Sequence, residues 1–201
     1  MSSAAVSELA WGTLGSPVGE ISVACSAAGL AQVRFGPPPV PPRQAPGPAS
    51  GAGDQPEGAD GEPGGADRQL DRARTQLGEY FAGRRRAFDV PVDWSGMSAS
   101  QRQVLPVLLA SAAYGETVTY GALARRAGLA DGGKVPAARV TGQIMGSNPC
   151  PIIVPCHRVV AGDGLGGYSG GTGIEIKRWL LIFEGSLPPT LDWDPAGPAV
   201  G

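Results

Sequence analysis

The sequence predicts an α+β protein in which a small antiparallel sheet is followed by helices. Residues 9–35 alternate apolar and polar side chains in three short runs, separated by Gly, Ser and Pro residues that favour turns. Apolar side chains then recur at helical spacing in five later segments. These segments are residues 67–82, 98–113, 119–128, 135–146 and 172–184. We therefore expect a small N-terminal α/β domain, a β-meander plus one helix, and a mainly helical C-terminal domain.

The composition is uneven along the 201 residues, and this unevenness suggests the domain boundaries. Residues 36–66 contain 17 Gly or Pro among 31 positions, so we expect a low-complexity insertion with no apolar face of its own. We expect residues 1–92 to form the N-terminal domain around this insertion and residues 93–187 to form the C-terminal domain. The Pro-rich residues 188–201 are expected to be a flexible tail.

Charge and cysteine content limit the cellular setting and the class of partner. The formal net charge is −2, yet residues 98–187 hold eight Lys or Arg against five Asp or Glu. A mildly basic C-terminal half is compatible with a face that contacts phosphates. Three cysteines form no disulfide framework, and no apolar run is long enough to span a membrane, so we expect a reduced, cytoplasmic protein.

Capping residues and breakers mark the ends of the predicted helices. We expect Asp67 to cap the first helix and Thr119 to cap the third. Thr172 and Glu175 have the spacing of a capping box at the start of the last helix. Pro106 lies inside the second predicted helix, where it removes one backbone hydrogen bond, and we expect a kink there.

The chemically informative stretch is residues 152–160, an apolar run interrupted by a cysteine and the only histidine in the chain. We expect the run before Pro155 to be strand-like and to end in a rigid turn, because proline fixes its own φ and restricts the residue before it. That turn would present Cys156 next to His157, a pairing that suggests a thiolate nucleophile. Cys25, in the middle predicted strand, is expected to be an ordinary core residue.

The residues around this stretch resemble the O6-alkylguanine-DNA alkyltransferases over roughly residues 68–187. The similarity lies in Pro-Cys-His-Arg followed by Val-Val, in the preceding Asn148-Pro149, and in Gly-Tyr-Ser-Gly-Gly at 167–171. The resemblance implies irreversible transfer of an alkyl group from a damaged base to the cysteine, so each protein molecule reacts once. It also implies that residues 119–128 and 135–146 form the helix-turn-helix of a winged-helix-like domain.

The resemblance assigns catalytic roles to four residues. Cys156 would accept the alkyl group and His157 would take the thiol proton, which we expect to pass through a water molecule. Glu184 would orient and support the imidazole. Tyr120 would help to rotate the nucleotide and to protonate the leaving base. Glu184 lies in the last turn of a predicted helix, where the dipole disfavours a carboxylate, and this also suggests a local partner.

The resemblance also implies a second group of residues, which would bind DNA and the extruded base. Arg139 would fill the gap in the base stack, and the small Ala137, Ala138 and Gly142 would let the helix approach the minor groove. Asn148 would link the helix-turn-helix to the cysteine segment. The base pocket would be lined by Met145, Tyr168 and Ser169.

The implied partner is double-stranded DNA with an alkylated base, bound from the minor groove with base flipping. O6-methylguanine is the expected lesion, with O4-methylthymine as a second substrate, and we expect a monomer in solution without cofactor or metal. The connector 128–134 is longer than the family pattern. Two alternatives remain at this point: a non-catalytic sensor of alkylated DNA, which the presence of Cys156 disfavours, and a thiol hydrolase using Cys156, His157 and Glu184.

Overall fold

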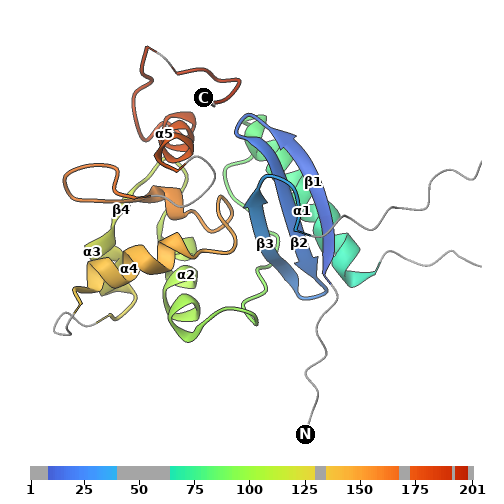
Figure 1. Cartoon of the computed structure of the whole chain (residues 1–201), viewed down its shortest axis with the longest axis horizontal. Coiled ribbons are helices and arrows are strands. Elements are labelled where there is room, and N and C mark those ends of the chain that lie inside the picture. The colour runs from blue at the N-terminus through green and yellow to red at the C-terminus, as the bar shows by residue number, and fades with distance from the viewer. Residues whose placement is uncertain (1–8, 40–63, 130–134, 168–172, 192, 199–201) are drawn as a thin grey trace, which may run out of the picture.

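The computed structural model describes residues 9–39, 64–129, 135–167, 173–191 and 193–198. Figure 1 shows a sheet and its covering helix on one side and a group of helices on the other. The N-terminal sheet is antiparallel, in the order β1 (Ala10–Ser16), β2 (Gly19–Ser26) and β3 (Gly29–Phe35). The predicted α+β class and the β-meander are confirmed. Most of the low-complexity insertion and part of the 128–134 connector lie outside the described residues.

Helix α1 (Gly65–Phe81) covers one face of this sheet (Figure 1). The apolar stripe predicted for this helix is buried at Leu70, Ala73, Leu77 and Tyr80. Gly12 of β1 permits the close approach, because a Cβ at that position would come within 3.2 Å of the Leu70 side chain. The helix and the inward side of β2 therefore form the N-terminal part of the core.

The remaining elements form the mainly helical half. They are α2 (Ala99–Ser111), β4 (Val118–Thr119), α3 (Tyr120–Arg126), α4 (Ala137–Gly146), the 3₁₀ turn η1 (Cys156–Arg158), β5 (Val159–Val160) and α5 (Ile174–Phe183). Strands β4 and β5 pair in parallel and connect the start of α3 to the end of η1. Within the described residues, no helix is long and apolar enough to cross a membrane.

The two halves are joined along the outer edge of β3. The Leu30 N–H donates to the carbonyl of Pro91 at 2.8 Å, and the Val33 N–H donates to the carbonyl of Pro149 at 2.8 Å. These bonds satisfy backbone groups that an open strand edge would expose. Gly29 is required at this junction, because its φ is +143° and a Cβ would lie 2.2 Å from the Pro91 oxygen. The segment that leads to Cys156 is thus anchored on the N-terminal sheet.

Three local predictions were wrong. The N-cap of α1 is Gly64, with Asp67 one turn inside the helix, because the helix starts two residues earlier than predicted. The N-cap of α5 is Gly173, one residue after the predicted cap, and it makes no side-chain cap. Thr172 itself lies outside the described residues. The third error concerns residues 152–154 and is described with the site.

The predicted N-cap of α3 and the predicted position of Pro106 are confirmed. Thr119 caps α3 by accepting a hydrogen bond from the Ala122 N–H at 3.2 Å. Pro106 lies inside α2, as the sequence predicts.

Part of the C-terminal segment contacts the core, because Trp193 stacks on Trp179 of α5 with ring centroids 6.4 Å apart. The Trp179 indole also donates to the carbonyl of Asp194 at 2.7 Å.

Helix α2 begins with a capping box that the sequence analysis did not identify. The Ser98 hydroxyl accepts from the Gln101 N–H at 3.3 Å, and the Gln101 side chain accepts from the Ser98 N–H at 2.8 Å. The Gln101 amide also donates to the carbonyl of Ser147 at 2.7 Å, so the cap ties α2 to the end of α4.

We predict that Ser98→Ala lowers the free energy of unfolding by about 1 kcal/mol, because it leaves a helix N-terminal N–H without its acceptor. Chemical denaturation of the purified variant measures this. Ser100→Ala, an exposed position in the first turn of the same helix, is the matched control and should change stability by less than about 0.5 kcal/mol. Equal effects of the two substitutions would contradict the role of the cap.

Candidate active site

The segment that carries Cys156 is a series of tight turns rather than the predicted strand-like run. Ile152 has a φ of +73°, which is strained for a β-branched residue. The Val154 N–H donates to the carbonyl of Cys150 at 2.9 Å, which closes a turn over the apolar residues. These residues therefore do not form a strand, although all of their side chains are buried, as the sequence suggested.

Pro155 produces the last of these turns. Its φ of −82° and ψ of 64° are those of an inverse γ-turn, and the Cys156 N–H donates to the carbonyl of Val154 at 2.8 Å. The same carbonyl accepts from the Asn148 side-chain amide at 2.9 Å, while the Asn148 amide oxygen accepts from the Cys150 N–H at 3.1 Å. Asn148 thus fixes the turn from the end of α4. The expected link between the helix pair and the cysteine segment is present in the geometry.

His157 and Glu184 form a buried pair. The imidazole Nε2 lies 2.9 Å from Glu184 Oε1, and both side chains have no solvent exposure. Glu184 is the C-cap of α5, and His157 belongs to η1, so the pair joins the last helix to the cysteine turn. The local partner that the position of Glu184 suggested is present.

Arg158 is a second buried partner of the same carboxylate. Its Nε donates to Glu184 Oε2 at 2.8 Å and its Nη2 donates to Oε1 at 2.9 Å, which is the two-bond fork typical of arginine. Its Nη1 donates to the carbonyl of Ala112 at 2.6 Å. Tyr80 of α1 adds a fourth bond, from its hydroxyl to Glu184 Oε1 at 2.7 Å. The buried charge of Glu184 is therefore fully hydrogen-bonded.

These contacts set the protonation states. Burial alone would raise the pKa of Glu184, but His157 and Arg158 lower it from 4.5 to about 2, so the carboxylate is ionised at neutral pH. Burial lowers the pKa of His157, and although Glu184 acts in the opposite direction, the net shift is downward. The imidazole is thus neutral at neutral pH.

The tautomer of His157 follows from the hydrogen bonds. An ionised carboxylate can only accept, so Nε2 must carry the proton that points at Glu184. The free lone pair of the neutral ring is then on Nδ1. That atom is buried and has no hydrogen-bond partner among the described residues. His157 therefore offers a base at Nδ1, on the ring edge opposite the carboxylate.

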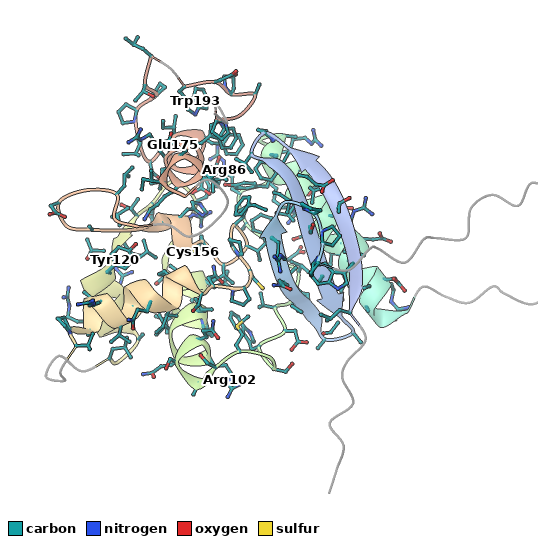
Figure 2. All side chains as sticks on the ribbon, viewed as in Figure 1. Arg86, Arg102, Tyr120, Cys156, Glu175 and Trp193 are labelled. Atoms are coloured by element: carbon teal, nitrogen blue, oxygen red, sulfur yellow. The ribbon has the colours of Figure 1, made fainter. Side chains whose placement is uncertain are left out.

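Cys156 lies at a pocket of about 510 Å³ that is lined by residues of α3 and α4 and by Gly167. Figure 2 shows Cys156 between α4 and α5, in the same half of the molecule as Tyr120. The lining contains five of the predicted site residues or their neighbours: Tyr120, Ala138, Arg139, Gly142 and Met145. The pocket lining is mostly apolar and includes one exposed cation, Arg139. Its volume is in the range of sites that bind small molecules.

Of the other predicted site residues, one lies beside the pocket and two are not described by the structure. Ala137 is buried at the start of α4, adjacent to the lining residues Ala138 and Arg139. Tyr168 and Ser169 lie outside the described residues. The Tyr120 hydroxyl donates to the carbonyl of Gly167 at 3.0 Å, and burial raises the pKa of this phenol, so it stays protonated and able to donate.

The other two cysteines have a different environment. Cys25 and Cys150 are fully buried, and neither lines the pocket. Burial raises the pKa of Cys25 to about 12 and raises that of Cys150 as well. The core role predicted for Cys25 is consistent with this. Only Cys156 combines a buried base next to it with access to the pocket.

Sequence reasoning missed Lys177 as well as the two extra partners of Glu184. Lys177 has no exposed surface, and its Nζ donates to the carbonyls of Val159 at 2.6 Å and Gly167 at 3.2 Å. Burial lowers its pKa from 10.5 to about 8. A signal did exist, because Lys177 and Glu184 are seven residues apart and so share one face of α5. The partner Tyr80 had no such signal, since it is 104 residues away in sequence.

Comparison with known proteins places the chain in a family. Residues 99–186 match the family model described as 6-O-methylguanine DNA methyltransferase, DNA binding domain. Residues 9–94 match the model for the ribonuclease-like domain of the same family. The chain therefore belongs to the O6-methylguanine DNA methyltransferase family.

Individual relatives agree with this assignment. The chain is 53% identical over 85 residues to a methylated-DNA--protein-cysteine methyltransferase of Mus musculus, covering 42% of this chain and 37% of the relative's length. It is 40% identical over 118 residues to a DNA base-flipping protein of Thermus thermophilus, covering 58% of this chain and 74% of that protein. The crystal structure of Mycobacterium tuberculosis OGT in complex with DNA matches with a TM-score of 0.63 and 34% identity, covering 94% and 95% of the two chains.

The site predicts a specific pH dependence of stability. Because the folded pKa of Glu184 lies below its ordinary value, the carboxylate stabilises the fold above about pH 4.5, and this contribution disappears as the pH falls toward 2. We predict that Glu184→Gln lowers the free energy of unfolding by about 3 kcal/mol at pH 7. The difference from the wild type should shrink steadily between pH 4.5 and pH 2.

Chemical denaturation at a series of pH values tests this prediction. Glu175→Gln is the matched control, because Glu175 is exposed on the same helix (Figure 2). It should leave stability within about 0.5 kcal/mol of the wild type. A Glu184→Gln deficit that stays constant down to pH 2 would show that the carboxylate is not ionised in the folded protein at neutral pH.

Proposed function

We propose that this chain repairs DNA by transferring an alkyl group from the O6 atom of guanine to its own Cys156, once per protein molecule. The observation that carries the proposal is the placement of Cys156 at an apolar pocket with a neutral, oriented imidazole next to it. Membership of the family and the similarity to the OGT–DNA complex support the same reaction.

The proposed chemistry begins with the thiol proton. An ordinary thiol is mostly protonated at neutral pH, and thiolate is the reactive form. Nδ1 of His157 accepts this proton, through a bridging water, and the resulting imidazolium is stabilised by Glu184, which is already ionised. Arg158 keeps the carboxylate oriented throughout this step.

The second step moves the alkyl group. A lone pair on Cys156 Sγ attacks the alkyl carbon, and the carbon–O6 bond breaks with its electron pair going to the base. The base then takes a proton, for which the Tyr120 hydroxyl at the pocket wall is the proposed donor. The thioether product has no leaving group that water could displace easily, so the protein stays alkylated.

The proposed DNA contacts use α4. A base inside a duplex cannot reach a buried sulfur, so the target nucleotide must leave the stack. Arg139 is exposed near the start of α4 and also lines the pocket, so it can fill the space of the extruded base. The adjacent Ala138 and Gly142 keep this face of the helix narrow, which fits an approach from the minor groove.

The direct test is stoichiometric methyl transfer. Incubation with duplex DNA that contains O6-methylguanine should add one methyl group per molecule, located by mass spectrometry on the Cys156 peptide. Cys156→Ala should abolish the gain. Cys150→Ser is the matched control, because Cys150 is buried away from the pocket and a hydroxyl retains the donor that lies 3.4 Å from the carbonyl of Ala31. Repeated turnover, or no methyl gain by the folded wild type, would refute the proposal.

A second prediction separates base extrusion from thiol chemistry. Arg139→Ala should slow methyl transfer from duplex DNA by about 10-fold or more, because the gap in the stack is then left unfilled. Transfer from the free base O6-methylguanine should be unchanged, because no stack has to be opened. Arg72→Ala, which removes an exposed arginine on α1, is the control and should affect neither substrate. An equal loss on duplex and free base would contradict the assigned role.

A further inference from the structure

Tyr80 is a buried titratable group from the N-terminal half that the mechanism above does not use. It lies near the end of α1 and has no exposed surface. Its ring packs against Phe81, Phe88, Tyr114 and Phe183, with centroid distances between 5.1 and 6.2 Å. These ring contacts leave the hydroxyl little freedom of direction.

The Tyr80 hydroxyl shares an oxygen with the imidazole. Glu184 Oε1 accepts from Tyr80, from His157 Nε2 and from Arg158 Nη2, whereas Oε2 accepts from Arg158 Nε. Burial and the adjacent carboxylate raise the pKa of Tyr80 well above 10, so the phenol is the donor in this bond. The hydrogen bond from Tyr80 thus partly neutralises the negative charge of Oε1, and this weakens the attraction of that oxygen for a protonated His157.

The other charged and titratable groups around the pair are known from the structure. Arg158 comes from η1 and Lys177 from the same helix as Glu184, and both disfavour a positive imidazole. Tyr114, from the segment before β4, faces the cluster with its ring, but its hydroxyl donates to the backbone carbonyl of Phe183 at 3.3 Å. Arg86 lies over that ring at 5.4 Å. Among the tyrosines that the structure describes, Tyr80 is the one whose hydroxyl donates to the carboxylate, since those of Tyr114 and Tyr120 donate to backbone carbonyls.

We propose that Tyr80 is a positioning residue for the alkyl-acceptor site, through which the N-terminal sheet-and-helix unit controls the basicity of His157. The hydroxyl holds Oε1 in place and shares its charge, so His157 stays a neutral base rather than a resting imidazolium. This inference rests on the proposed function for its consequence in catalysis, but the effect on the imidazole can be measured without any reaction.

The test uses the fact that His157 is the only histidine in the chain, so one imidazole signal titrates in the NMR spectrum. Tyr80→Phe removes the shared hydrogen bond and keeps the ring. The titration midpoint of His157 should rise by about 0.5 to 1 pH unit, the equivalent of one ordinary hydrogen bond. Tyr114→Phe is the matched control, because it removes a hydroxyl from the same aromatic cluster without touching the carboxylate. Its midpoint should equal that of the wild type.

The catalytic readout should follow the titration. The acidic limb of the pH profile for methyl transfer should move upward with the imidazole, so the rate on that limb falls about 3- to 10-fold in Tyr80→Phe, in proportion to the shift. In a Glu184→Gln background, Tyr80→Phe should no longer move the midpoint. An unchanged midpoint in folded Tyr80→Phe, or an equal shift in Tyr114→Phe, would overturn the inference. A shifted midpoint with no methyl transfer in any variant would support the coupling and refute the proposed function instead.

Discussion

The buried carboxylate of Glu184 is the constraint on which the rest of the site depends. A charge with no access to water is costly unless it is fully hydrogen-bonded, and Glu184 receives its bonds from two elements: Tyr80 of α1, and His157 and Arg158 of η1. Each donor must come to one point, so the carboxylate fixes the position of the last helix relative to the cysteine turn. These bonds keep the carboxylate ionised, whereas burial keeps the imidazole neutral.

A second constraint is the turn that delivers Cys156. Three features act together there: the positive φ of Ile152, the inverse γ-turn at Pro155 and the two hydrogen bonds that the Asn148 side chain makes with the segment. The strain at Ile152 is held by burial on all sides and by the bonds that join this region to β3. The consequence is a sulfur that faces the pocket while the next residue faces the carboxylate.

Much of this arrangement could be predicted from the sequence, and the limits have physical causes. The meander, the five helices and the Thr119 cap follow from apolar spacing and turn chemistry, which are local properties. The Cys156 and His157 pair was recognisable from the residues around it. The strand-like prediction for residues 152–154 was wrong because a continuous apolar run indicates burial but does not specify backbone conformation. The early start of α1 and the shifted N-cap of α5 are errors of one or two residues at helix ends.

The partners of Glu184 show what local patterns cannot supply. From the sequence, Tyr80 is an ordinary member of an apolar stripe and Arg158 has no assigned partner, yet the fold brings both to one carboxylate. The central claim is that this carboxylate presents His157 as a neutral base at Nδ1. The nitrogen chemical shifts of the single imidazole at pH 7 test it most directly. A neutral ring with its proton on Nε2 is the predicted result, whereas an imidazolium or a proton on Nδ1 would contradict the account.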